Sequence, residues 1–281
     1  MPIALAANSY GKSQVRLVKV ERRGAHHELT DLNIDIALSG EFSAAYASGD
    51  NRDVLPTDTM KNTVYALARK QPLGEIEEFG LRLADHFLTR NPQVSSARIA
   101  VRQNLWKRIL VNGRPHNHAF LKAGGGRRTA VVTSDRKHAE IKSGIDELEI
   151  LKTSGSAFEG YIHDEYTTLK ETRDRLFGTI VKAEWLYQPG SHSFGSLWDT
   201  VRHTVLEVFA CHDSRGVQHT LYAIGETVLS RAKEIVEIHL SMPNRHCLLV
   251  DLSPFGLDNP NEVFLPIDEP HGLIEATLRR G

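Results

Sequence analysis

The chain has 281 residues, a length typical of about two domains. Hydrophobic residues make up 41% and charged residues 25%, which excludes a disordered or collagen-like chain. Lys and Arg number 34 against 35 Asp and Glu, for a net charge of −1, so we expect no nucleic-acid partner.

The first half alternates between strand-like and helix-like patterns. Residues 14–19 and 32–38 carry apolar side chains at every second position and predict an antiparallel hairpin. Residues 58–69 and 75–88 change to helical spacing. Residues 95–109 predict a further strand, with hairpin partners at 118–121 and 129–134, and the Gly-rich stretch between 112 and 128 is otherwise expected to be loop.

The second half follows the same order. Residues 179–187 predict a strand, 194–209 and 217–229 predict helices, and 235–240 and 247–252 predict strands. Each half therefore has the order β-β-α-α-β-β or one close to it, without a residue-level repeat. Strands grouped around helix pairs favour an α+β fold with antiparallel sheets. We predict two domains, residues 1–135 and 136–281.

The sequence contains few signals of cellular localisation. No apolar run approaches the ~18 residues that span a bilayer, and the run at residues 3–7 is too short for a signal peptide. The two cysteines, Cys211 and Cys247, are too few to form the disulfide framework of a small secreted protein. We expect a cytoplasmic protein without a membrane partner, from a bacterial source.

Common catalytic and cofactor motifs are missing from the sequence. It has no Gly-x-Gly-x-x-Gly after a strand, no Walker loop and no Gly-x-Ser-x-Gly. Gly195-Ser196 is interpreted as a helix start capped by the serine. The tightest histidine pairs, His26-His27 and His116-x-His118, lack the spacing of a zinc site, so no metal is expected.

Three short polar strings stand at element junctions. Thr57-Asp58 follows a proline and opens a helix, which by itself indicates an N-cap and an acid at the positive helix end. Arg175, taken alone, is a charge on an exposed helix or turn. The string from Pro243 to His246 separates two apolar strands and indicates a loop or bulge.

Taken together, these strings resemble blocks of the urate oxidase (uricase) family. The blocks run in order from residue 10 to about 275, and a chance match of that order is very improbable. They are YGK at 10–12 with VRLVKV at 15–20, TDTMKNTVY at 57–65, HNHAF at 116–120, LKTSG at 151–155 with Phe158, DEYTTLKET at 164–172 with Asp174-Arg175, and PN-x-H at 243–246 with DL at 251–252 and NPNEVF at 259–264.

The resemblance implies a fold, an activity and an assembly. Uricases have two tandem tunnelling-fold (T-fold) domains, each an antiparallel sheet with two helices on one face, and they close their barrels by pairing subunits, typically as a homotetramer. They oxidise urate with O₂ to 5-hydroxyisourate and H₂O₂ without a metal or organic cofactor. The expected partners are therefore urate, O₂ as co-substrate and further copies of the chain.

The resemblance also implies residue roles in binding the substrate. Arg175 matches the family's arginine that binds urate, and its planar fork can form two parallel hydrogen bonds where Lys cannot. Gln218 matches the residue that pairs with the opposite edge of the ring, with a backbone N–H from Val217. Phe158 matches the aromatic side chain that stacks on the purine face.

Further residues match the family's proton-relay and oxygen-binding positions. Lys12, Thr57 and His246 match the proton relay, and a buried Lys can take part in it if its pKa falls. Asn244 matches the residue that holds O₂ or water above the ring, and Asp58 lies near the five-membered ring. In the family, the Lys, Thr and Asp come from one subunit, and the other site residues come from its neighbour.

Two alternatives from other classes stay open at this point. Related T-fold enzymes act on pterin and purine rings, and those that hydrolyse rings generally use zinc held by Cys and His; the sequence has no Cys-His cluster. The second alternative is a catalytically inactive purine-binding homologue. The simultaneous presence of all the matched polar residues argues against it.

Overall fold

The computed structural model describes residues 3–281, which form two compact units. The first unit comprises the chain up to Gly144 together with Pro189–Gly195, and the second comprises Ile145–Gln188 and Ser196–Gly281. Strand β7 (Ala139–Lys152) begins in the first unit and ends in the second. The domain boundary predicted between residues 135 and 136 precedes this strand and stays a prediction.

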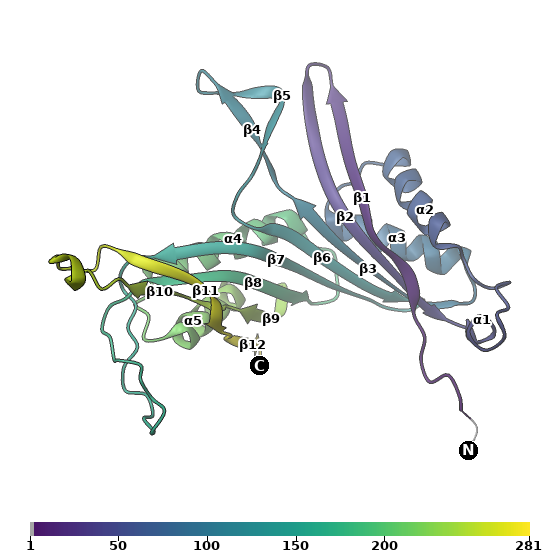
Figure 1. Cartoon of the computed structure of the whole chain (residues 1–281). Helices are drawn as coiled ribbons and strands as arrows, with labels where there is room; N and C mark the ends of the chain where they lie inside the picture. Colours follow the sequence, from purple (N-terminus) through teal and green to yellow (C-terminus); the bar gives the residue numbers. More distant parts are fainter. Residues whose placement is uncertain (1–2) are drawn as a thin grey trace. The chain divides into compact units, whose positions relative to one another are not determined.

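In the first unit, an antiparallel sheet carries two main helices on one face (Figure 1). Its strands lie in the order β1-β2-β3-β6-β7, and β4 and β5 form a separate two-stranded sheet. The elements are β1 (Tyr10–Arg23), β2 (His26–Gly40), α1 (Ser43–Ser48), α2 (Thr57–Lys70), α3 (Ile76–Arg90), β3 (Val94–Asn104), β4 (Trp106–Val111), β5 (Arg114–Lys122) and β6 (Arg127–Asp135).

The core of the first unit lies between the sheet and these helices. Every second residue of β2 from Leu32 to Leu38 is at most 2% exposed, and α3 buries Phe79, Leu83 and Phe87 against the same core. This is the period-two and helical spacing that predicted the hairpin and the helices. The core therefore fixes which face of each strand points toward α2 and α3.

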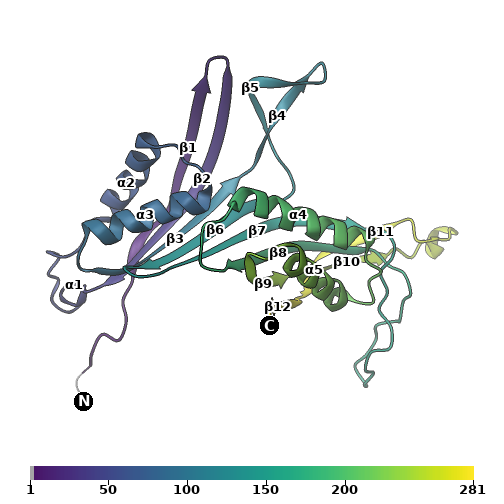
Figure 2. The same ribbon diagram turned by 180° about the vertical axis from the view of Figure 1, so that it is seen from behind.

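The second unit repeats the plan, with α4 and α5 along one face of its strands (Figure 2). Strand β8 pairs with β9 and with β10, β9 pairs with β12, and β10 pairs with β11, all antiparallel. The elements are β8 (Phe177–Tyr187), α4 (Phe194–Cys211), α5 (Val217–Arg231), β9 (Ile235–Ser241), β10 (Asn244–Leu249), a 3₁₀ turn (Ser253–Phe255), β11 (Phe264–Gly272) and β12 (Glu275–Arg279).

The structure corrects several local predictions. The strand expected at 95–109 ends at Asn104, and its remainder forms β4, which pairs with β5 inside the stretch expected to be loop. Ser196 is not the cap of its helix, because α4 begins at Phe194. Strands β7, β11 and β12 were not predicted. No helix in the described part of the chain is long and apolar enough to cross a membrane.

Candidate active site

Lys12 lies on the helix-covered face of β1. Its partner across the β1–β2 ladder is Ile36, which is 2% exposed and belongs to the core. Directly opposite residues point to the same side of a sheet. The half-buried Lys12 side chain therefore points toward the face on which α2 begins.

Thr57 and Asp58 open α2. The N-cap is Pro56, which makes no side-chain cap bond, so Thr57 is the first helical residue and its predicted capping role is wrong. Asp58 accepts hydrogen bonds from Lys61 Nζ at 2.5 Å and from Asn62 Nδ2 at 2.9 Å. The Lys61 bond is the largest cause of the lowered pKa of Asp58, and the Lys12 charge contributes to it. Lys12 and the start of α2 are thus electrostatic neighbours.

Phe158 and Arg175 lie together in the second unit. The Arg175 guanidinium carbon is 5.1 Å from the centre of the Phe158 ring. Phe158 is fixed by paired backbone hydrogen bonds with Thr172, at 2.8 and 3.0 Å. Burial lowers the pKa of Arg175, yet an arginine stays protonated in proteins. Within residues 3–281, no acidic side chain forms an ion pair with it.

Gln218 and the Val217 N–H lie at the start of α5, beside Phe158. Gly216 is the N-cap residue, and a Cβ built on it would lie 3.5 Å from Gln218 Oε1 and 3.6 Å from Phe158 Cδ2. The first N–H groups of a helix have no partner within the helix and are suited to bind an acceptor or anion. The amide, the ring and the helix start therefore converge around Gly216.

Asn244 and His246 stand at the start of β10. Asn244 pairs with Thr179 of β8 and Gly272 of β11, and the register with β11 shifts between Asn244 and His246. The sequence indicated a loop or a bulge here; residues 244–246 lie within β10, and the irregularity is that of a bulge. The pKa of His246 is lowered by burial first, then by the Arg175 charge and by His271. The imidazole is therefore held neutral close to the guanidinium.

The predicted site residues thus fall into two groups. Lys12, Thr57 and Asp58 belong to the first unit, and the remaining six belong to the second. Within the second group, Arg175 is a neighbour of both Phe158 and His246, and Phe158 and Gln218 both approach Gly216. The assigned roles themselves remain predictions.

Sequence reasoning missed Tyr161. Its ring stacks on Phe158, with centroids 4.8 Å apart and planes 15° apart, and His163 stacks on Tyr161 in turn. The Tyr161 hydroxyl donates to the Leu169 carbonyl at 2.7 Å. The sequence offered one signal for it: Tyr161 is an aromatic residue between the matched block that ends at Phe158 and the one that begins at Asp164.

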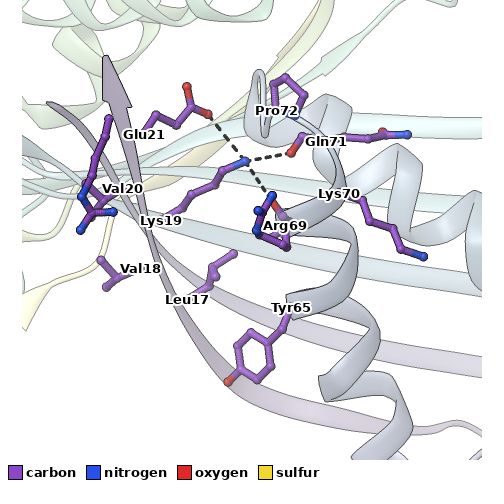
Figure 3. A pocket seen from close by; sticks show the side chains of 12 residues that line it. Leu17, Val18, Lys19, Val20, Glu21, Tyr65, Arg69, Lys70, Gln71 and Pro72 are labelled. Carbon is purple, nitrogen blue, oxygen red and sulfur yellow. Dashed lines mark hydrogen bonds and ion pairs between the residues drawn. The ribbon is translucent and has the colours of Figure 1, made fainter. Parts of the chain in front are cut away.

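Two other features lie apart from this site. The pocket between β1 and the end of α2 contains none of the predicted residues (Figure 3). There Lys19 donates to the carbonyls of Ala68 and Gln71, both at 2.8 Å, and so caps the end of α2. In the part of the chain that the structure describes, no group of three or more His, Cys, Asp or Glu side chains is placed to hold a metal ion.

The fold and the site define a class: an α+β protein with two T-fold units, whose grouped cation, amide and aromatic ring suit a flat anionic ring. A uricase family model matches residues 8–133 and 141–275. The chain belongs to the uricase family.

Named relatives agree along almost the whole chain. A uricase of Arthrobacter globiformis is 46% identical over 278 residues, covering 99% of this chain and 90% of that protein. A uricase of Dictyostelium discoideum is 40% identical over 279 residues, covering 98% of this chain and 97% of that protein. The crystal structure of the Arthrobacter globiformis uricase has a TM-score of 0.95 and covers 100% of this chain and 96% of that one.

Proposed function

We propose that this protein is a urate oxidase that needs neither a metal nor an organic cofactor. Urate, O₂ and water give 5-hydroxyisourate and H₂O₂, and an electron pair passes from the urate anion to O₂. The observation that carries the proposal is the half-buried Arg175, which has no acidic partner among the described residues and lies against Phe158. A partly buried cation without a counter-ion gains from an anionic ligand.

Each second-unit residue has a distinct part in binding. The Arg175 fork pairs with a carbonyl and an adjacent ring nitrogen of urate, which gives direction as well as charge. Gln218 and the Val217 N–H hold the opposite edge of the ring. Phe158 stacks on the purine face, which contributes about 1 kcal/mol beyond area burial.

The first-unit residues and His246 handle protons. Oxidising the urate anion and forming H₂O₂ require protons to leave the purine and reach reduced oxygen. Neutral His246 accepts a proton that leaves the purine, and Lys12 and Thr57 transfer it to the reduced oxygen. Asn244 holds O₂, and then the attacking water, above the ring through its amide. Asp58 stands beside the five-membered ring.

The site is assembled between copies of the chain, in a homotetramer. The division of the site residues between two compact units supports this proposal, because each group can come from a different subunit. Exposed apolar side chains on the β4–β5 sheet, such as Leu110 and Leu121, also favour a partner surface. Free Cys211 and Cys247 support a reducing, cytoplasmic setting.

The test is a stoichiometric assay on chelator-treated, desalted protein. We expect one mole of O₂ to be consumed and one mole of H₂O₂ to be formed per mole of urate oxidised. The Arg175→Ala variant serves as a control and should be nearly inactive. Absence of urate consumption would overturn the proposed activity. Loss of turnover on chelation, restored by a divalent ion, would overturn the cofactor-free mechanism and favour a metal-dependent ring enzyme.

A further inference from the structure

Strand β1 contains an irregularity immediately after Lys12. Lys12 pairs with Ile36 and Val15 pairs with Ile34, so two residues, Ser13 and Gln14, face the single residue Asp35. This two-against-one arrangement is a β-bulge, a feature that re-aims neighbouring side chains.

The bulge decides which face of the sheet Lys12 occupies. Downstream of it, Val15 is 3% exposed and points into the core. In a regular strand, residues 13 and 11 would share that face and Lys12 would point to the other one, because one residue of slip reverses every side chain. The extra residue instead brings Lys12 and Tyr10 to the helix side, where the Tyr10 hydroxyl accepts a hydrogen bond from the Leu55 N–H at 2.9 Å.

Asp35 accepts the hydrogen bond from the backbone of this bulge, and Asn33 Nδ2 donates a second one to the Gln14 side chain at 2.6 Å. Gln14 has a φ of +59°, a left-handed conformation that is unfavourable for a residue with a Cβ. Its N–H donates to Asp35 Oδ1 at 2.7 Å. The other carboxylate oxygen, Oδ2, accepts from Arg102 Nη2 on β3, also at 2.7 Å. Both partners of this ion pair are less than one-third exposed.

We propose that Asp35, oriented by Arg102, is a positioning residue for the reaction: it stabilises the bulge that turns Lys12 toward the start of α2. The inference rests on the proposed function, since it acts through Lys12. Asp35 lies on the opposite face of the sheet from the core and needs no contact with substrate to exert this effect.

The test compares two substitutions at Asp35. Asp35→Ala removes the acceptor for the Gln14 N–H, and we expect kcat to fall roughly tenfold or more, the loss typical of one charge-assisted hydrogen bond, with KM changed less than about threefold. Asp35→Asn keeps an acceptor oxygen and should retain most of kcat. Hydrogen exchange in the peptide around Gln14 should quicken in Asp35→Ala.

A rescue variant separates positioning from general stability. Glycine adopts positive φ without the Cβ penalty, so Gln14→Gly in the Asp35→Ala background should recover at least threefold of the lost kcat. Asp31→Ala is the matched control: it removes a carboxylate of the same strand that pairs with Arg16 at 2.6 Å, at a regular register position opposite Val18. It should lower the melting temperature and leave kcat within about threefold.

The outcomes distinguish this proposal from the proposed function. Wild-type protein that does not oxidise urate refutes the function before any variant is made. If Lys12→Met is inactive while Asp35→Ala keeps wild-type kcat, the function stands and the positioning role is wrong. The role is also wrong if Gln14→Gly restores nothing, or if Lys12→Met itself keeps full turnover.

Discussion

At the scale of single residues, the decisive feature is a cation held partly out of water beside an aromatic face. Arg175 lies over Phe158, and its charge adds to burial in lowering the pKa of His246, so one guanidinium acts on a proposed binding residue and on a proposed proton-transfer residue. We propose that its charge binds the substrate, and it adds to burial in lowering the pKa of the neighbouring His246. Substitutions that keep the Arg175 charge but change its shape, and substitutions that remove the charge, should therefore have different effects.

Arg175→Lys keeps the charge and loses the planar fork. We expect kcat/KM for urate to fall by roughly tenfold to a hundredfold, because a hydrogen bond to a charged group contributes about 1.5–3 kcal/mol. Steady-state kinetics at saturating O₂ measure this loss. Kinetics within twofold of wild type would refute Arg175 as the residue that binds the urate edge.

We expect the activity to depend on pH through the protonation state of His246. Burial and the Arg175 charge lower the pKa of His246 below its ordinary 6.5, so its neutral, proton-accepting form prevails at neutral pH and is lost as pH falls. Activity should therefore decline only on the acid side of that value. Arg175→Gln removes the repulsion and should raise the His246 pKa, measured by NMR of labelled histidine. Arg215→Gln, which removes an exposed arginine of the same unit, should leave it unchanged; a similar rise would contradict the assignment.

At the scale of elements, a buried polar cluster ties α3 to the sheet of the first unit. Glu77 is fully buried and accepts hydrogen bonds from Arg128 at 2.7 Å and from Ser143. Arg128 also pairs with the more exposed Glu75 at 2.6 Å. Such a cluster stabilises the fold only while every charge keeps its partner.

Glu77→Ala should lower the free energy of unfolding by about 3 kcal/mol, the low end of the range for breaking a buried pair, because Glu75 still compensates Arg128. Urea denaturation measures this loss, provided that the slope of the unfolding free energy against urea concentration is the same for both proteins. Glu77→Gln keeps one acceptor oxygen for Arg128, and its amide NH₂ can donate to the Ser143 hydroxyl, so it should cost less. Asp50→Ala, which breaks the exposed pair with Arg52, should change little. Equal effects of Glu77→Ala and Asp50→Ala would contradict the account.

The predictable elements were those with a clear one-sided core. β2 alternates strictly because one face packs under the helices, and α3 shows helical spacing for the same reason. β11 and β12 were not predicted, because almost all of their side chains are exposed. Their sequences therefore lack the alternation of apolar and polar residues that marks a half-buried strand. The bulge after Lys12 was equally hidden, because it is a shift in the pairing of β1 with β2 that the residue pattern of β1 alone does not encode.

The site was predictable to a different degree from the fold. Residue types and block order, through the family resemblance, predicted Lys12, Arg175 and Gln218 as site residues, and their roles stay predictions. The grouping around Gly216 and the stacking of Tyr161 on Phe158 depend on close approach of distant segments, which periodicity does not encode. The capping interpretation of Thr57 failed because Pro56 already occupies the position before the helix.

At the scale of the whole molecule, the candidate site is divided between two compact units. Lys12, Thr57 and Asp58 lie in one unit, and Arg175 and its neighbours lie in the other. β1 and β11 end the strand orders of their units and present backbone groups that a second copy can pair with. We propose that one chain's first group meets another chain's second group in the assembled protein.

Mixing of two inactive variants tests whether the site is shared between subunits. Lys12→Met and Arg175→Ala homo-oligomers should each be nearly inactive, because every site carries one defect. Co-expression at equal ratio makes half of the pairs mixed, and in each mixed pair one site carries both defects and the other carries none. The account predicts that roughly a quarter of wild-type urate oxidation returns. Verified mixed oligomers that recover no activity would contradict it and place each site within a single chain.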